Sequence, residues 1–270
     1  MVKPDAIRPD DHCFVIPAHG ASEHLETCLE SLLAQSVRSK VLIATSTPND
    51  HIRDLADRHG IPVHVNPERE GIGADWNFAL DVADTPWVTL AHQDDVYLGD
   101  FTRQTLLALS RHPDALMAFC RYGEIEEALE RPVSTLIRIK NVLLELGFLG
   151  SEAASSPLFK TNALRFGCPI PCPSVTVWKE TGLRFRTDLK VDLDWAAWLS
   201  LAKRPGSFVY LREKLMMHRV HRDSETSNAI SSGSRLAEDT RILRSLWPGF
   251  IAKAIVASYR IAYRSNRSQP

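Results

Sequence analysis

Two adjacent carboxylates, Asp94 and Asp95, follow a short apolar run over residues 85–91 that has the composition of a buried strand. Ionised carboxylates side by side repel each other, so a pair at the rim of a core calls for a cation or for solvent. His92 adds an imidazole, which suits Mn2+ better than Mg2+. The spacing predicts a divalent metal site for Mn2+ or Mg2+. The alternatives are an acidic turn in water for the pair and a turn cap or core filler for His92.

A second acidic pair, Asp192 and Asp194, opens an apolar stretch with helical spacing. Residues two apart point to different sides of a helix, so at most one of these side chains faces a site while the other caps the helix. The alternative is that both carboxylates are only N-terminal caps, placed where a helix favours negative charge. The residues by themselves leave both roles open.

A dense cationic cluster, His218 to Arg222, follows a predicted strand. Within it Arg219 is the best candidate to bind a phosphate, because its charge is permanent and its fork matches two oxygens. His221 is a candidate for a further metal ligand. A solvated basic loop is the competing interpretation.

The elements that must position these groups alternate along the first half of the chain. Predicted strands at 13–17, 41–44, 62–65 and 85–91 are separated by segments with helical periodicity. Such alternation favours an α/β fold with an open, mainly parallel sheet and helices on both faces. Because ligands bind at the carboxyl ends of such strands, we expect the polar clusters at 17–20, 45–50 and 92–95 to converge on one crevice.

Beyond residue 109 this alternation fades. Residues 124–167 mix helical patches with glycines and a serine-rich stretch, which suggests a mobile lid or an insertion. A helix is predicted at 192–203, a strand at 207–211 and a closing helix at 236–247.

The composition is that of an ordinary globular protein. The 270 residues are 44% hydrophobic and carry 32 basic and 33 acidic side chains, a formal net charge of -1, which gives no global attraction for nucleic acid. No signal sequence and no stretch of membrane-spanning length is evident, so we expect a cytoplasmic protein. The five scattered cysteines are expected to be reduced and mostly buried thiols.

The tail over residues 250–267 is basic, with Lys253, Arg260, Arg264 and Arg267 and no acid. On a helix these side chains form one stripe opposite an apolar one. Such a helix could lie on an anionic membrane surface. It could equally pack on the domain or on a second subunit of a homodimer.

At this point the chain resembles a known family, the inverting glycosyltransferases of family 2, which have the Rossmann-like GT-A fold. The resemblance covers roughly residues 12–228 and rests on short motifs in the family's order. They are the segments Val15–His19, Gly71–Asn77, His92–Asp95, Pro171–Val175, Asp192–Leu199 and His218–Ser224.

The resemblance implies a single GT-A domain at 12–247, preceded by an N-terminal extension at 1–11 and followed by the tail at 248–270, with 124–167 on the acceptor side. It implies transfer from a UDP-, TDP- or GDP-sugar to a glycan or lipid-linked glycan in polysaccharide biosynthesis. Asp194 is then the base, and Asp95, Asp94, His92 and His221 are metal ligands. Donor-binding residues are expected to be Pro17, Ala18, His19, Ser46, Asp50, Asn77, Asp94, Arg219 and Ser224; for Asn77 the alternative is a tie between helix and loop.

The chain departs from the family pattern at three places. Relatives usually carry an Asp at the end of the second strand, where this chain has Thr45-Ser46-Thr47, so base recognition differs or passes to Asp50. His92 replaces the first acid of the metal signature, and Trp76 replaces a frequent Arg. Two rival functions therefore stay open: a sugar-nucleotide binding module without turnover, and a nucleotidyltransferase. The second would need a Gly-rich, basic loop after the first strand, which is not found here.

Overall fold

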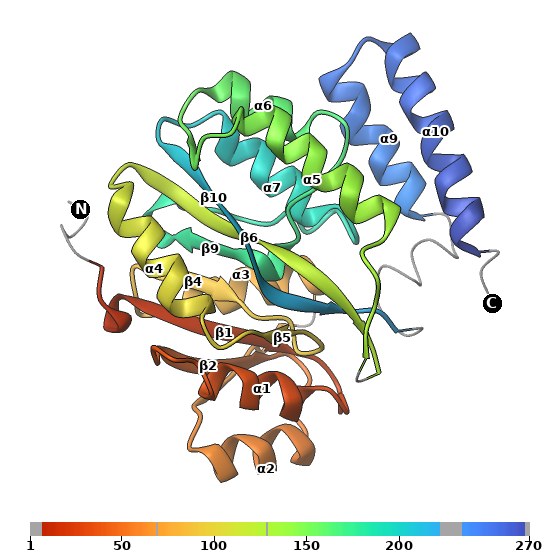
Figure 1. Ribbon diagram of the computed structural model, residues 1–270. Coiled ribbons are helices and arrows are strands. Elements are labelled where there is room, and N and C mark those ends of the chain that lie inside the picture. Colours follow the sequence, from red (N-terminus) through yellow and green to blue (C-terminus); the bar gives the residue numbers. More distant parts are fainter. Residues whose placement is uncertain (1–6, 69, 128, 222–233, 268–270) are drawn as a thin grey trace.

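The computed structural model describes residues 7–68, 70–127, 129–221 and 234–267 (Figure 1). Its centre is one mixed sheet. In spatial order the strands are β3 (Val63–Val65), β2 (Lys40–Thr45), β1 (His12–Ala18), β4 (Trp87–Leu90), β9 (Val175–Trp178), β6 (Ala115–Glu126), β10 (Ser207–Arg219) and β5 (Val96–Tyr97), with β7 (Leu129–Glu130) beside β6 and β8 (Ala153–Ala154) beside β10.

Strand β1 shows why the sheet is covered twice. It pairs in parallel with β2 and with β4, and its side chains alternate between two separate apolar clusters. Cys13 and Val15 belong to one cluster, Phe14 and Ile16 to the other, and all four are fully buried. Alternation on a strand buried on both faces requires helices on both sides of the sheet.

The helices form those two layers. One cluster packs the sheet against α1 (Leu25–Leu33), α2 (Asp50–His59) and α4 (Phe101–Arg111). The other packs it against α3 (Ile72–Val82), α5 (Thr135–Phe148), α6 (Pro157–Leu164), α7 (Leu193–Ala202), α9 (Ser234–Leu246) and α10 (Gly249–Arg267). The expected α/β fold with helices on both faces is confirmed.

The expectation of a mainly parallel sheet holds for β3, β2, β1 and β4, and β6 and β10 also pair in parallel. Strand β9 lies between β4 and β6 and runs antiparallel to both. All four of its residues are buried, and the hydroxyl of Thr176 lies 2.6 Å from that of Thr89 on β4. The sheet is therefore mixed, because a strand from the later half of the chain enters its centre.

Residues 124–167, expected to be a lid or insertion, contain the end of β6 and the packed pair α5 and α6. Gly147 permits this contact, since a Cβ there would lie 2.5 Å from the Cβ of Ala163. Near the other end of the chain, Ala252 and Val256 of α10 are buried in the same cluster, so one face of α10 packs on the domain. No helix within the described residues combines the length and apolar character needed to cross a membrane.

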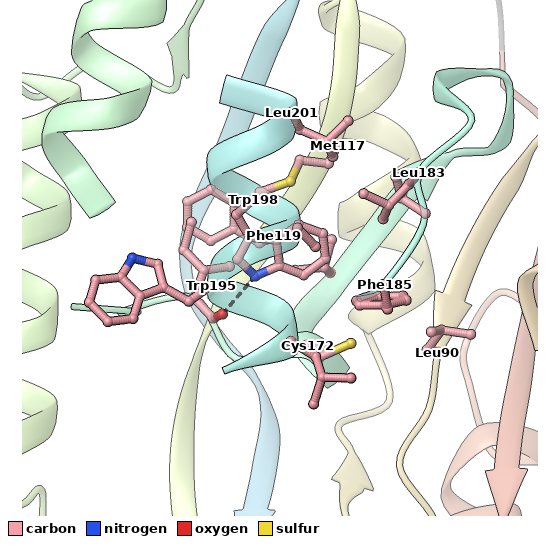
Figure 2. Packing of buried hydrophobic residues seen from close by; sticks show 14 of the residues in the cluster. Leu90, Met117, Phe119, Cys172, Leu183, Phe185, Trp195, Trp198 and Leu201 are labelled. Carbon is pink, nitrogen blue, oxygen red and sulfur yellow. Dashed lines mark hydrogen bonds between the residues drawn. The ribbon is translucent and has the colours of Figure 1, made fainter. Parts of the chain in front are cut away.

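Two tryptophans anchor α7 in the core (Figure 2). Trp195 and Trp198 are each 1% exposed, and their indole nitrogens donate to the carbonyls of Leu164 and Ile170 at 2.9 and 3.0 Å. A buried indole with its N–H satisfied is a rigid, apolar anchor. Their packing fixes the helix that carries Asp194.

Candidate active site

Loops at the carboxyl ends of β1, β2 and β4 are joined by hydrogen bonds. The backbone N–H of His19 donates to Gln93 at 3.0 Å, and Gln93 donates back to the carbonyl of His19 at 3.2 Å. The N–H of Gly20 donates to the Thr47 hydroxyl at 2.8 Å, and the Asn49 amide donates to the Gly20 carbonyl at 3.0 Å. The three polar clusters therefore meet at one edge of the sheet.

His92, Asp94 and Asp95 form a group that fits a metal ion. Each offers one ligand atom, and these atoms lie within 4.8 Å of one another. Asp95 is fully buried, and its Oδ2 has no hydrogen-bond partner among the described residues; the same holds for Nε2 of His92. Buried polar atoms without partners are costly, and a carboxylate oxygen and an imidazole nitrogen are both good ligands for Mn2+.

The end of β10 holds the other carboxylate oxygen of Asp95. His218 Nδ1 lies 3.0 Å from Oδ1, and the N–H of Arg219 donates to the same oxygen at 2.9 Å. Burial opposes a charged imidazole at His218, but the nearby Asp95 and Asp94 outweigh it and raise the pKa of His218. Asp95 is thus oriented by a strand that closes the sheet more than a hundred residues later.

Asp94 is held by the segment that follows. Its Oδ2 lies 3.1 Å from Nε2 of His221, and its carbonyl accepts from Nε of Arg219 at 2.8 Å. Burial pushes the pKa of Asp94 upward, yet the hydrogen bond with His221 and the charge of His218 lower it to about 2. Asp94 is therefore ionised at neutral pH.

Arg219, expected as a phosphate ligand, and His221, expected as a metal ligand, both make contacts within the protein. The Arg219 side chain is buried and also donates to the carbonyl of Glu127, so its guanidinium ties β10 to two loops. His221 contacts Asp94 but lies outside the three-residue group described above.

His92 is kept neutral by its surroundings. Burial lowers its pKa, against the opposing charges of Asp95 and Asp94. Its ring lies 4.8 Å from that of Trp76, and its carbonyl accepts from the Cys28 thiol at 3.2 Å. Neutral imidazole is the form that binds metals.

Asp194 lies in the first turn of α7. It is close enough to the metal-type group of His92, Asp94 and Asp95 for its charge to raise the pKa of His92. Burial, together with the charges of Asp194 and Asp95, raises the pKa of the Cys172 thiol. Burial also raises the pKa of Asp194, against the charges of Arg235 and Lys140. A carboxylate with a raised pKa, half-buried beside a metal-type site, is suited to accept a proton.

A comparison with known families decides the class. Residues 13–172, more than half of the chain, match the model of the family described as glycosyl transferase family 2. The chain belongs to glycosyl transferase family 2. The protein is thus a glycosyltransferase, as the motifs suggested. No curated protein is similar enough in sequence to count as a match.

Solved structures share the fold of this family 2 glycosyltransferase. TarS 1-349 of S. aureus, in complex with UDP-GlcNAc, matches with a TM-score of 0.64 and 13% identity over 92% of this chain and 71% of TarS 1-349. The mannosyltransferase PcManGT of Pyrobaculum calidifontis, in complex with GDP-Man and Mn2+, matches with a TM-score of 0.63 and 16% identity over 94% of this chain and 73% of its own. At these identities the likeness establishes the GT-A fold.

The glycosyltransferase contains a carboxylate at the end of β2 that the motif analysis did not single out. Asp75, in the first turn of α3, accepts from the Ser46 hydroxyl at 2.9 Å and from the Asn66 amide at 3.2 Å. The Thr45-Ser46-Thr47 segment has no acid, but Asp75 brings one there from another element. The sequence signal that could have indicated Asp75 is its position in the first turn of a helix that follows Gly71, within the motif Gly71–Asn77.

The other expected donor ligands of the glycosyltransferase differ in their surroundings. Pro17 and Ala18 end β1 beside the joined loops. Asp50 starts α2 with a largely exposed carboxylate paired with Arg53. Asn77 exchanges two hydrogen bonds with the backbone of Phe185, at 2.9 and 2.8 Å, which is the expected alternative of a tie between helix and loop. Ser224 lies outside the described residues.

Proposed function

We propose that this chain is a metal-assisted, inverting glycosyltransferase that moves a sugar from a nucleoside-diphospho-sugar to an acceptor hydroxyl. The proposal rests on two buried ligand atoms, Nε2 of His92 and Oδ2 of Asp95, which have no hydrogen-bond partner among the described residues. Asp194 is near enough for its charge to act on the pKa of His92. The nucleotide sugars in the TarS and PcManGT complexes support this donor class, and the Mn2+ in the latter supports the cofactor.

In the proposed reaction Asp194 accepts the proton of the acceptor hydroxyl. The acceptor oxygen forms a bond to C1 of the sugar while the bond from C1 to the diphosphate oxygen breaks, and the nucleoside diphosphate leaves with the electron pair. Attack from the face opposite the leaving group inverts the configuration at C1. The raised pKa of Asp194 increases its basicity in this step.

Mn2+ or Mg2+ would be held by Asp95, Asp94 and His92. The ion would supply positive charge against the negative charge that grows on the departing diphosphate. His218 and Arg219 keep Asp95 oriented for this role through the contacts to its Oδ1.

The test is calorimetric binding of UDP, GDP and TDP, each with Mn2+ and with chelator, to the wild type and to Asp95→Ala. We expect metal-dependent binding of one nucleotide that the substitution abolishes. Binding of no nucleotide under either condition would overturn the donor assignment. Asp194→Ala then separates an enzyme from a binding module, because an enzyme loses turnover and keeps donor affinity.

The acceptor is proposed to be a glycan or a lipid-linked glycan in polysaccharide biosynthesis, reached on the cytoplasmic side. The proposed acceptor site lies beside α5, which carries Lys140. Lys140 of α5 acts on the pKa of Asp194, and its Nζ donates to the Tyr122 hydroxyl at 3.0 Å. The basic tail is proposed to bring the enzyme to the membrane surface where such acceptors reside.

A further inference from the structure

The start of α7 lacks the usual cap. Asp192 occupies the N-cap position, but its side chain makes no capping hydrogen bond. Asp194 Oδ1 accepts from the N–H of the next residue, Trp195, at 2.7 Å. Asp192 therefore stands at the cap position without capping through its side chain, while Asp194 accepts from one N–H of the first turn. The N–H groups at a helix start need acceptors, and the N–H of Asp192 finds one on another element.

That acceptor is Glu238 of α9. Its Oε1 accepts from the N–H of Lys190 at 2.9 Å, and its Oε2 accepts from the N–H groups of Val191 and Asp192, each at 3.0 Å. Three consecutive backbone N–H groups that converge on one carboxylate form an anion nest. The contact joins residues 46 to 48 positions apart, so α9 holds the segment that leads into α7.

We propose that Glu238 is a positioning residue for Asp194, a proposal that rests on the assignment of Asp194 as the base. Asp194 is two residues beyond the last N–H that Glu238 holds, and Trp195 and Trp198 fix the helix only from the core side. Glu238 fixes the segment 190–192 at the N-terminal end of α7. When it is lost, the first turn of α7 is free to shift and the Asp194 carboxylate moves relative to the metal-type group.

The matched control lies on the same helix. Arg241 pairs with Asp188 at 2.9 Å, so it links α9 to the same loop before α7, but both side chains are more than half exposed and the pair does not reach the helix start. Glu238→Gln keeps the size of the side chain. Its amide group turns hydrogens toward the backbone N–H groups, so the contact with residues 190–192 is disrupted with little change in packing.

The experiment measures release of nucleoside diphosphate from UDP-GlcNAc and from GDP-mannose by wild type, Glu238→Gln, Arg241→Gln and Asp194→Asn. We expect Glu238→Gln to lower kcat about 10- to 100-fold, the loss typical of a small misplacement of a catalytic group, with the donor KM unchanged. Arg241→Gln keeps kcat. Hydrogen exchange of the amides of residues 190–195 rises in Glu238→Gln alone, and thermal unfolding checks that each variant is folded.

The outcomes separate the two proposals. If Asp194→Asn loses turnover while Glu238→Gln keeps both turnover and amide protection, the positioning role is overturned and the base assignment stands. If Asp194→Asn keeps turnover, the base assignment fails and the positioning role fails with it. Equal losses in Glu238→Gln and Arg241→Gln would reduce the contact to general stabilisation and overturn the role as well.

Discussion

At the scale of single residues, Asp75 shows how a fold can bring a carboxylate to the end of a strand whose own sequence contains no acid there. The β2 end provides only hydroxyls, and Ser46 there donates to Asp75 from α3. An oriented carboxylate next to a hydroxyl is a suitable acceptor for the N–H groups of a nucleobase or for the hydroxyls of a ribose.

We expect Asp75→Ala to weaken binding of the nucleoside diphosphate. Loss of a hydrogen bond to a charged group costs about 1.5–3 kcal/mol, which is roughly a 10- to 100-fold increase in Kd. Asp81→Ala is the control, because Asp81 lies on the same helix and pairs with Arg184 in an exposed ion pair. Equal affinities of the two variants in calorimetry would exclude Asp75 from the donor site.

Asp192 gives a pH-dependent stability. Its burial, together with the charge of Asp239, raises its pKa from 3.8 to about 8, and its Oδ2 has no partner among the described residues. The folded protein therefore retains a proton that the unfolded chain has lost between about pH 4 and pH 8. The stability contribution of Asp192 is full below pH 4 and is lost as the pH rises to about 8, by at most about 1.4 kcal/mol per pH unit.

Asp192→Asn should remove this dependence. We expect the melting temperature of the variant to equal that of the wild type near pH 4 and to exceed it near pH 8. Thermal unfolding across this range gives the comparison. A constant difference at all pH values would mean that Asp192 does not retain its proton in the folded protein.

At the scale of elements, the alternating first half of the chain was predictable, because apolar strand runs and helical periodicity are local features of the sequence. Strand β6 and most of β10 were missed, since their pairing partners are distant in sequence and β10 carries exposed charges such as Glu213 within an otherwise buried run. The group of His92, Asp94 and Asp95 was predicted from one tetrapeptide. The contact of His218 with Asp95 and that of Glu238 with the segment before α7 were not predicted, because only the folded chain brings these residues together.

Asn77 joins two elements, and its contribution is measurable. Its amide satisfies both the N–H and the carbonyl of Phe185, so it locks α3 to the loop before α7. We expect Asn77→Ala to lower the free energy of unfolding by about 1–3 kcal/mol, because it leaves these backbone groups without their partner. Denaturant unfolding with Asp81→Ala as the control measures this. A large loss of donor affinity without loss of stability would instead support a direct donor contact.

At the scale of the whole molecule, α10 has one face on the domain and another in solvent. Ala252 and Val256 are buried, whereas Phe250 is 76% exposed and Lys253 is exposed as well. If the tail lies on a membrane, the face that bears Phe250 and Lys253 is the one that contacts it, since basic and aromatic side chains favour an anionic interface.

Sedimentation with vesicles tests this orientation. We expect the wild type to sediment with vesicles that contain anionic lipid and not with neutral ones, and the double variant Phe250→Ser and Lys253→Glu to bind less. The melting temperature should stay the same, because neither side chain is in the core. Equal sedimentation of wild type and variant would place membrane binding elsewhere or exclude it.

The hydrogen bonds from the end of β10 to Asp95 also have a consequence for folding during protein synthesis. The donors to its Oδ1 come from residues 123 and 124 positions later in the chain. At a translation rate of roughly 5–20 residues per second, the ribosome adds the end of β10 roughly 6–25 s after it adds Asp95. A fragment that ends at residue 172, where the family match stops, would carry the acids without that strand. Activity should therefore emerge only when the last strand has left the ribosome and joined the sheet.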